Sequence, residues 1–416
     1  MDELIIKQLT TPEDSYQYSR LASISFHSTN AGLADKNAFK ERIAQSETNS
    51  PADKTRQGNH RTRTGLFRGE QLLSTLTAHA FEVNFDGNIG EMCGIGGVMS
   101  DPSARKTGGV TQLMHHELSA MRDRGQVFSH LYPFQSSFYR KFGYVHCAFA
   151  ERWTIPAQFL PEVPYQIHWY ENKPEEQQAV KALYQTFAAQ YNLSVRRNDL
   201  RWASIFKKLQ PYSGSNFSYL HYGEDGPDGF LSYHTKTFDN APMTILVDHL
   251  YFTNPAALRK MLAFLGSQRA YAAEVQLTLP EDADITFWLK EICTAYDKCN
   301  IRREKIHLGA SRVVDVASVL KLARYQGSGV ASIRVDDPVC PWNNSVFRVE
   351  FDGCCQSVTE SDDWDIRLGI DAFTALILGS REFSQSCYMD GVEIRGNMEN
   401  LQKIFYKKSL WIGDGF

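Results

Sequence analysis

The stretch from Val98 to Val110 reads VMSDPSARKTGGV. It follows a run with the apolar and β-branched character of a strand, and after it apolar residues recur at helical spacing up to Met121. Pro102 and the polar residues between these runs have the composition of a turn. The stretch therefore predicts a strand, a turn and an amphipathic helix over Gly108–Arg124. This junction is typical of an α/β protein built on a sheet covered by helices.

The turn also has the features of an anion site. The first turn of a helix leaves several backbone N–H groups without partners, and the helix dipole favours a negative charge there. Gly108 and Gly109 keep side chains away from that backbone, while Arg105 and Lys106 add positive charge. The segment is thus a candidate pyrophosphate cradle. It is neither a P-loop nor a dinucleotide fingerprint, and a plain glycine-rich turn with two solvated cations is the alternative that the residues alone leave open.

The same order of elements occurs a second time. The sequence LVDHLYFTNPAALRKMLAFL from Leu246 matches IGGVMSDPSARKTGGVTQLM from Ile95 in running from a strand through a polar residue and a proline into a helix. A duplicated domain explains this most simply. The second copy has no glycine between Pro255 and Gly266, so we expect it to lack the anion site.

The flanking patterns extend this reading. They predict strands at 3–9, 62–68, 71–85, 91–100 and 127–132, a helix at 12–26 and a polar loop at 48–60. The order of predicted strands and helices changes again near residue 301. A length of 416 residues at ~150 residues per domain gives two to three domains. We expect domains at 1–155, 156–295 and 296–416.

Composition excludes several classes of protein. Lys+Arg 44 against Asp+Glu 48, with no long basic run, argues against nucleic-acid binding. The longest apolar stretch, near Phe373–Leu378, is too short to cross a membrane. The acidic N-terminus does not resemble a signal peptide, which predicts a cytoplasmic protein. The eight cysteines form no CxxC, and His115-His116-Glu117 lacks metal-ligand spacing, so we expect reduced cysteines and no metal site.

Two motifs carry a resemblance. Arg105 and Gly108 match the Gln/Arg-x-x-Gly-x-Gly/Ala loop of the GNAT acyltransferase superfamily, although Val110 stands at its last small position. The aromatic segment FYRKFGY at 138–144 follows as it does in that superfamily. With SRVVDV at 311–316, a second domain without the loop and a final Phe416, the whole chain resembles the Eis (enhanced intracellular survival) acetyltransferase family. The resemblance implies two tandem GNAT-like mixed-sheet domains followed by a sterol-carrier-like α+β domain.

The resemblance also implies acetyl-CoA as the cosubstrate and assigns residues to it. The strand before the loop would bond the pantetheine, and the loop would hold the pyrophosphate with Arg105 beside it. Two further residues of the cosubstrate site would come directly after the next strand. The residues implied are Val98, Met99 and Ser100 for the strand, Lys106, Thr107, Gly108, Gly109, Val110 and Thr111 for the loop, and Phe134 and Gln135 for the pair.

The family's general acid corresponds to Tyr139, with Tyr144 as the rival. A phenol with a pKa near ~10 is protonated at neutral pH and can give its proton to a departing thiolate. The family's general base is the terminal carboxylate, here that of Phe416. The flank Gly413-Asp414-Gly415 lets the tail bend inward, Phe416 offers an apolar anchor, and Asp414 could attract a cationic substrate.

The sequence thus predicts an acetyl-CoA-dependent N-acetyltransferase. Acetyl would pass directly to a primary amine, aminoglycoside-like or other, in a ternary complex. The alternative is a lipid-binding protein that uses the sterol-carrier-like domain and keeps a vestigial transferase domain. The resemblance further implies a homo-oligomer, a hexamer as in relatives, and no residue specifies the amine.

Overall fold

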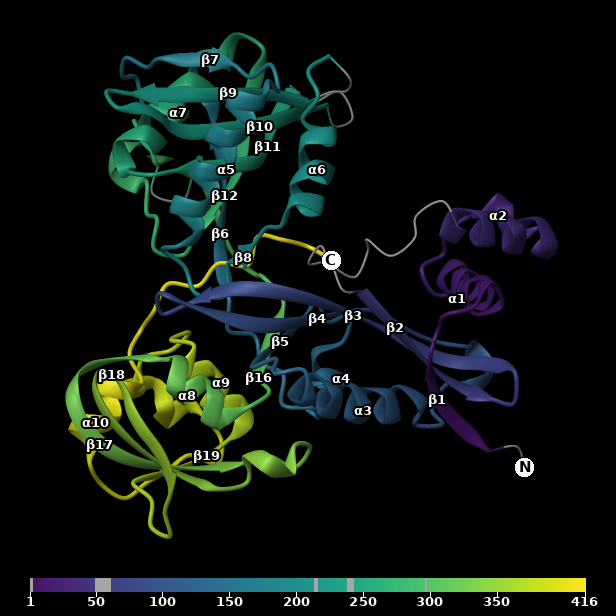
Figure 1. The fold of residues 1–416 in the computed structure, drawn as a ribbon. Coiled ribbons are helices and arrows are strands. Elements are labelled where there is room, and N and C mark those ends of the chain that lie inside the picture. The colour runs from purple at the N-terminus through teal and green to yellow at the C-terminus, as the bar shows by residue number, and fades with distance from the viewer. Residues whose placement is uncertain (1–2, 49–60, 213–215, 238–242, 296–297) are drawn as a thin grey trace. The chain divides into compact units, whose positions relative to one another are not determined.

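The computed structural model describes residues 3–48, 61–212, 216–237, 243–295 and 298–416. Most of the loop expected at 48–60 therefore lies outside the described residues. The chain divides into two compact units (Figure 1). The first unit contains residues 1–147, 309–407 and 414–416, and the second contains 148–308 and 408–413.

The first unit is built on a mixed sheet. Its strands lie in the order β1-β2-β3-β4-β5-β16. They span Leu4–Gln8, Arg61–Arg68, Gln71–Phe85, Asn88–Ser100, Phe128–Leu131 and Ala310–Val313. The pairing is antiparallel throughout except for β4 with β5, which is parallel. Asp86 and Gly87 both have positive φ and close a two-residue hairpin between β3 and β4.

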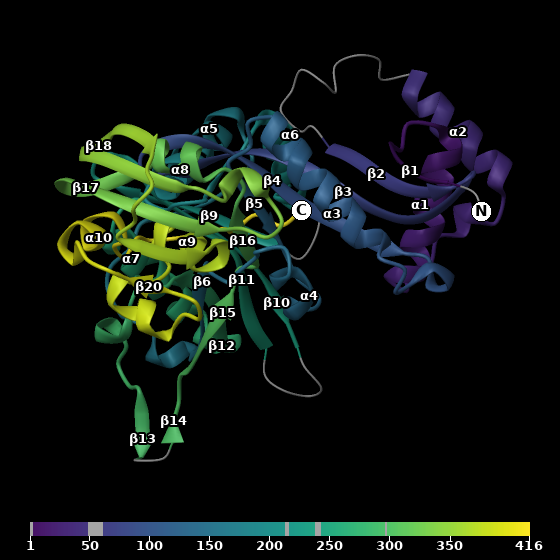
Figure 2. The same ribbon diagram turned by 90° about the horizontal axis from the view of Figure 1, so that it is seen from below.

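Helices cover both faces of this sheet. In Figures 1 and 2, α1 (Pro12–Ser25) and α3 (Gly109–Asp123) lie on opposite sides of β2–β4. Thr11 caps α1 through a capping box with Asp14. The helix α2 (Lys36–Thr48) has no counterpart in the sequence analysis. The apolar stripe of α3 is fully buried: Leu113, Met114, Leu118 and Met121.

A bulge in β4 shapes the site. Thr77 pairs with Gly96 and Thr75 with Met99, so Gly97 and Val98 together oppose the single residue between Thr75 and Thr77. Gly97 has φ +55°, which a glycine adopts without strain. The parallel pairing of β4 with β5 ends at Ile95. Beyond that point the two strands are no longer joined by hydrogen bonds, and a cavity opens at their ends.

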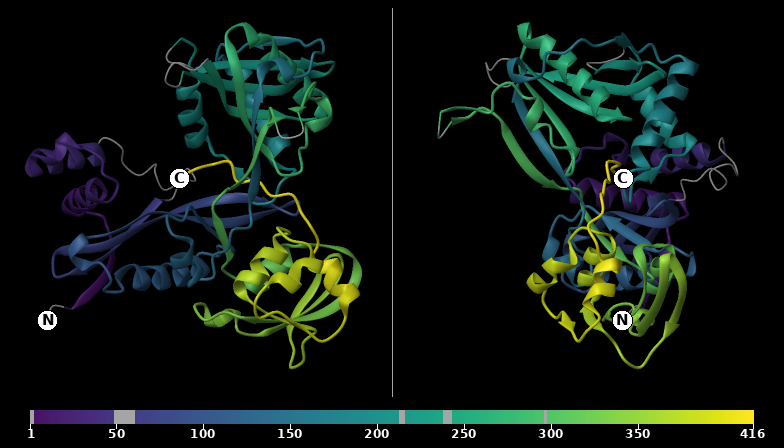
Figure 3. Two further views of the ribbon diagram at one scale, coloured as in Figure 1. Left: turned by 180° about the vertical axis from the view of Figure 1, so that it is seen from behind. Right: turned by 90° about the vertical axis from the view of Figure 1, so that its left-hand side faces the viewer.

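The first unit also contains a smaller sheet in the order β18-β17-β19-β20, spanning Val346–Glu360, Arg324–Asp336, Ile366–Gly369 and Glu393–Ile394. The helices α8 (Val316–Leu322), α9 (Ile370–Ile377) and α10 (Met398–Ile404) gather against it (Figures 1 and 3).

The segment SRVVDV links the two sheets of the first unit. Arg312 on β16 is fully buried, and its guanidinium donates to the carbonyl of Phe142 and to the equally buried carboxylate of Asp337. Ser311 Oγ lies 2.8 Å from His130 Nδ1, and Asp315 caps α8 by accepting from Ser318 N. Each polar residue of this motif therefore has a structural partner.

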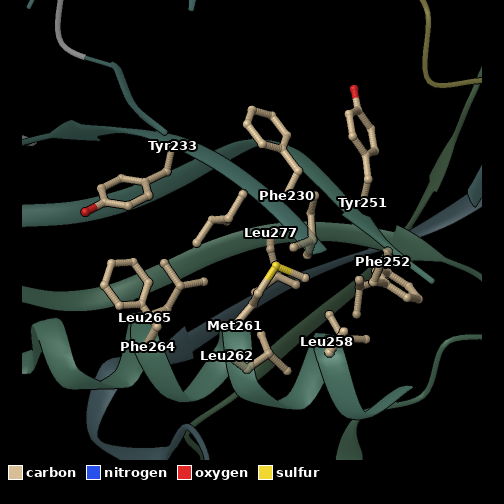
Figure 4. Packing of buried hydrophobic residues seen from close by; sticks show 14 of the residues in the cluster. Phe230, Tyr233, Tyr251, Phe252, Leu258, Met261, Leu262, Phe264, Leu265 and Leu277 are labelled. Carbon is tan, nitrogen blue, oxygen red and sulfur yellow. The ribbon is translucent and has the colours of Figure 1, made fainter. Parts of the chain in front are cut away.

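The second unit has a seven-stranded sheet in the order β15-β6-β12-β11-β10-β9-β7. The strands span Arg302–His307, Phe149–Pro156, Ala272–Pro280, Met243–Phe252, Gly226–Lys236, Asn216–Gly223 and Ile167–Trp169. Its long helices are α5 (Pro174–Ala188), α6 (Asp199–Lys208) and α7 (Pro255–Ser267), and β13 (Cys293–Ala295) and β14 (Lys298–Cys299) form a separate hairpin. Figure 4 shows α7 packed on the sheet through Leu258, Met261, Leu262 and Leu265.

Residues 408–413 belong to the second unit. A short bridge joins Leu410 to Asn192, with Asn192 N donating to Ser409 O and Trp411 N donating to Asn192 O. The Trp411 ring packs against Phe187 and Tyr191. This part of the tail is therefore held in place rather than frayed.

Candidate active site

A cavity of about 840 Å³ opens in the first unit between the end of β4, the start of α3 and the segment after β5. Eleven of the twelve residues expected at the cosubstrate line it: Val98, Met99, Ser100, Arg105, Lys106, Gly108, Gly109, Val110, Thr111, Phe134 and Gln135. The twelfth, Thr107, instead donates its hydroxyl to the carbonyl of Ala104 at 2.7 Å.

Five lining residues were not foreseen: Ser25, Phe26, Ala104, Phe138 and Lys141. Ser25 and Phe26 lie at the C-terminal end of α1, which sequence patterns alone do not bring near the loop. The Ser25 hydroxyl is buried and has no hydrogen-bond partner among the described residues. The cavity therefore has an unused polar group in its wall.

The start of α3 is open toward the cavity. Gly108 is the N-cap with φ +84°, and no side chain caps the helix. A Cβ at Gly108 would meet nothing within 4 Å, whereas one at Gly109 would lie 2.7 Å from Ser74 Oγ. Gly108 is thus required by its backbone conformation and Gly109 by packing. The N–H groups of the first turn are left without side-chain acceptors, as an anion site needs.

The charge at the cavity is positive. Arg105, Lys106 and Lys141 line it, and all three are exposed. No aspartate or glutamate is among the lining residues that the structure describes. Three cations with the N-terminus of a helix favour a polyanionic ligand such as a diphosphate.

Tyr139 lies on the short helix α4 (Ser136–Arg140) in an aromatic cluster. Its ring centroid is 5.8 Å from that of Phe134, 5.1 Å from Phe138 and 6.3 Å from Tyr144. Only 3% of Tyr139 is exposed, and burial raises its pKa to about 12. Phe134, in contrast, is 76% exposed at the cavity. The phenol of Tyr139 is therefore held protonated over the whole neutral range.

Tyr144, the rival, has a different environment. Its hydroxyl lies 2.7 Å from Ser129 Oγ, and both residues are buried. Burial raises the pKa of Tyr144 far above its usual range. An enclosed hydroxyl that already has a partner is suited to structure rather than to proton transfer.

The ring of Phe416 lies in a cage on the other face of the sheet from α3. The ring centroids of Phe81, Tyr132, His79 and His130 lie 5.2, 5.4, 5.7 and 6.0 Å away. The Tyr132 hydroxyl donates to the carbonyl of Asp414 at 3.1 Å. None of the four cage residues was foreseen from the sequence.

Two glycines of β4 make room for this tail. A Cβ at Gly94 would lie 2.6 Å from the Phe416 ring. A Cβ at Gly96 would lie 3.6 Å from both the main-chain oxygen of Phe416 and His79 Nε2. The two glycines at positions 94 and 96 are therefore explained by the close approach of the tail.

Within the described parts of the chain, no group of three or more His, Cys, Asp or Glu side chains could hold a metal ion. In the same residues no helix is both long and apolar enough to cross a membrane.

Comparison with known families assigns the parts of the chain. Residues 7–147 match an acetyltransferase (GNAT) domain, and residues 193–303 match a second domain of that description. Residues 316–413 match a sterol carrier protein domain.

Known proteins of similar length agree with this. The chain is 25% identical over 333 residues to an uncharacterized N-acetyltransferase from Streptomyces avermitilis, covering 76% of this chain and 79% of the relative. Among solved structures, a GCN5-related N-acetyltransferase from Anabaena variabilis has a TM-score of 0.80 at 18% identity, and a probable N-acyltransferase from Enterococcus faecalis has 0.79 at 20%. Eis1 from Mycobacterium abscessus has a TM-score of 0.76 at 18% identity. Each of the three alignments covers all of both chains.

The likeness to Eis1 extends over the whole fold, and the fold class expected from the sequence is confirmed. GNAT domains also imply the use of acetyl-CoA. The chain carries two GNAT acetyltransferase domains and a sterol carrier protein domain in an Eis-like arrangement, and it is an acyltransferase of the GNAT class.

Proposed function

We propose that this enzyme transfers acetyl from acetyl-CoA to a primary amine by direct attack in a ternary complex. The observation that carries the proposal is the cavity at the β4–α3 junction, where an uncapped helix N-terminus and three cations lie at the end of the strand that passes the Phe416 cage. Acetyl-CoA would bind at the cavity end of this segment of β4, and the amine would approach at the end beside the Phe416 cage.

The lining of the cavity fits the cosubstrate in its chemistry. The first-turn N–H groups of α3 would bind the pyrophosphate, with Arg105, Lys106 and Lys141 balancing its charge. The backbone of residues 98–100, released from β5, would hydrogen-bond the pantetheine. Phe134 and Gln135 would form the opposite wall. Bound acetyl-CoA supplies the activated acyl group.

The reaction needs two proton transfers. As the amine nitrogen forms its bond to the acetyl carbon, the bond from that carbon to sulfur breaks and a thiolate departs. Tyr139 would give its proton to the thiolate, because burial holds the phenol in its acid form. The attacking nitrogen must lose a proton, and the carboxylate of Phe416 would accept it.

The surroundings of Phe416 support the second role. Its main-chain oxygen lies beside Gly96, where β4 bulges, and the four aromatic rings fix the residue that carries it. An α-carboxyl group is ionised at neutral pH. His79 Nε2 lies at the same place on β4 and is the competing base.

The lipid-binding alternative is not favoured, because the cavity lining, the open helix N-terminus and Tyr139 are all present.

Three further points remain proposals: acetylation of a primary amine, domain boundaries near residues 155 and 295, and a homohexamer. Light scattering on the purified protein tests the last of these, and a monomer at micromolar concentration would contradict it.

The first test of the mechanism is Tyr139→Phe. Loss of a general acid costs about 10²–10⁴-fold in kcat, and acetyl-CoA affinity should not change because the ring remains. Tyr271→Phe, at a largely exposed tyrosine of the second unit, is the matched control and should leave kcat unchanged. A Tyr139→Phe enzyme with the parent kcat would exclude Tyr139 as the acid.

The second test concerns the base. Extending the chain beyond Phe416 by a short tag removes the carboxylate from its place, and we expect kcat to fall by about 10²–10⁴-fold with acetyl-CoA binding retained. His79→Ala is the companion variant. If the extended enzyme keeps the parent rate and His79→Ala loses it, His79 is the base. Intersecting double-reciprocal plots, rather than parallel ones, would support the ternary complex.

A further inference from the structure

Arg63 on β2 lies in an unusual environment for an arginine. Its Nε is buried and has no hydrogen-bond partner among the described residues, and no carboxylate of those residues is within ion-pair distance. Desolvation and the neighbouring charge of Arg61 lower the pKa of Arg63. A half-buried guanidinium without an anion is costly to keep.

Among the residues that the structure describes, Tyr18 offsets this cost. The guanidinium carbon of Arg63 lies 4.0 Å from the ring centroid of Tyr18 on α1, a cation–π contact. The Tyr18 hydroxyl lies 3.4 Å from Thr77 Oγ1 and 2.8 Å from where a Cβ would stand at Gly97. Tyr18 thus places Arg63 beside the bulge of β4, and no carboxylate within the described ranges pairs with the guanidinium.

The position of Arg63 relative to the proposed reaction centre follows from the strand register. Arg63 pairs with Thr77, and Thr77 pairs with Gly96, so the three residues form one row across the sheet. Two strand spacings amount to ~10 Å. Gly96 is the residue beside the main-chain oxygen of Phe416. The Arg63 side chain therefore shares a face of the sheet with the group proposed to deprotonate the amine.

The charge of that face is also informative. Alternate positions of β2 and β3 place Arg61, Arg63, Thr77, His79 and Phe81 on it. These five strand side chains include two arginines and no carboxylate, and the terminal carboxylate of Phe416 lies on the same face. The two arginines would attract a negative group on the acceptor, while the Phe416 carboxylate on the same face would attract its amine.

We infer that Arg63 binds an anionic group of the acceptor, so that the preferred substrate is an amine bearing a carboxylate or a phosphate on the same molecule. This inference rests on the proposed function. The guanidinium fork matches both anions through paired N–H donors. The anion would be held at Arg63 while the amine of the same molecule reaches the Phe416 carboxylate.

The experiment compares matched amines that differ only in charge. The probes are 4-aminobutyrate with its methyl ester, and 3-aminopropyl phosphate with 3-aminopropanol, each assayed with acetyl-CoA at fixed ionic strength. We expect kcat/KM to favour the anionic member of at least one pair by about 10- to 100-fold, the range for a hydrogen-bonded charge pair. The pair with the larger ratio identifies carboxylate or phosphate as the anion.

The variant Arg63→Gln should remove this preference. We expect KM for the anionic amine to rise about 10- to 100-fold, while kcat and KM for the neutral amine stay within about twofold. Arg63→Lys should keep part of the preference, because it retains the charge but not the fork. Arg68→Gln, at an exposed arginine at the other end of β2, is the matched control and should behave like the parent.

Two outcomes would overturn the inference. One is equal kcat/KM for the members of both pairs in the parent enzyme, and the other is an equal loss for both members in Arg63→Gln. If the parent acetylates no amine at all, the proposed function fails, and calorimetric titration with 4-aminobutyrate and 3-aminopropyl phosphate then decides on Arg63 separately. Binding by the parent and not by Arg63→Gln would support the anion site, and equal binding would refute it.

Discussion

The two GNAT domains use the same strand–turn–helix junction in opposite ways. In the first, α3 begins at Gly108 with no side-chain cap, and its first turn faces a cavity. In the second, α7 begins after Asn254, whose side chain accepts a hydrogen bond from Ala257 N at 2.9 Å, and Pro255 has no N–H to offer. The start of the second helix is capped by its own chain, whereas the first turn of α3 has no side-chain cap.

The surroundings of the two helix starts also differ between the domains. Past the parallel pairing of β11 with β12, the side chains of Phe252 and Leu277 are buried with Leu258 of α7 (Figure 4). At the matching place in the first unit a cavity opens, and its lining includes glycines, polar residues and exposed cations beside apolar side chains such as Val98 and Phe134. A binding site in this fold therefore depends on which groups the sequence leaves without an internal partner.

The largest expected effect comes from filling the open helix start. Gly108→Glu places a carboxylate where the pyrophosphate would bind, and we expect acetyl-CoA affinity to fall by more than about 100-fold. Calorimetry gives the affinity, and circular dichroism checks the fold.

Gly108→Ala is the control for that substitution. It carries the strain of a left-handed N-cap, about 1 kcal/mol or more, without the charge, and it should retain most of the affinity. A Gly108→Glu enzyme that binds acetyl-CoA within a few-fold of the parent would show that the pyrophosphate lies elsewhere.

A smaller effect is expected in the second domain. Asn254→Ala removes the cap of α7 and should destabilise the protein by about 1 kcal/mol, seen as a lower unfolding temperature of the second unit. The number of bound acetyl-CoA molecules should stay at one per chain, because the start of α7 lacks the glycines and the exposed cations that line the start of α3. Two equivalent sites in the parent would contradict the contrast between the domains.

The smallest effect concerns pH. Burial raises the pKa of Tyr139 to about 12, so its acid form is lost only as the pH rises through that value. With saturating amine, kcat should therefore stay level up to about pH 10, where a free tyrosine would be half ionised. A falling limb with an apparent pKa near ~10 that disappears in Tyr139→Phe would show that the phenol is less buried during turnover.

Much of the framework follows from local patterns. The strand at Gln71–Phe85 and the helix α3 lie where alternation and helical spacing place them, because each buries one regular face. Most of the cavity lining is also local, since ten of its residues belong to the single stretch from Val98 to Thr111. The helix α2 was missed because Phe39 is its only buried apolar side chain among residues 36–45.

The rest depends on contacts distant in sequence. Phe416 meets rings from β3 and from β5 and its end, and Arg63 meets Tyr18 of α1. One signal was present: period-two spacing puts Thr77, His79 and Phe81 on one face of β3. The spacing does not show which segment covers that face, because the residues of the tail contain no pattern that identifies β3 as their contact.

The buried guanidinium of Arg312 bears on how the modules of this enzyme could be separated. The sequence suggests a modular assembly in which the C-terminal part could be removed or exchanged. Yet this arginine, with the Phe142 carbonyl on one side and the Asp337 carboxylate on the other, belongs electrostatically to both parts of the first unit. A deletion that removed Asp337 would strand a cation in an apolar interior. Truncated proteins made for dissection should therefore aggregate, and in evolution the two parts should be inherited together.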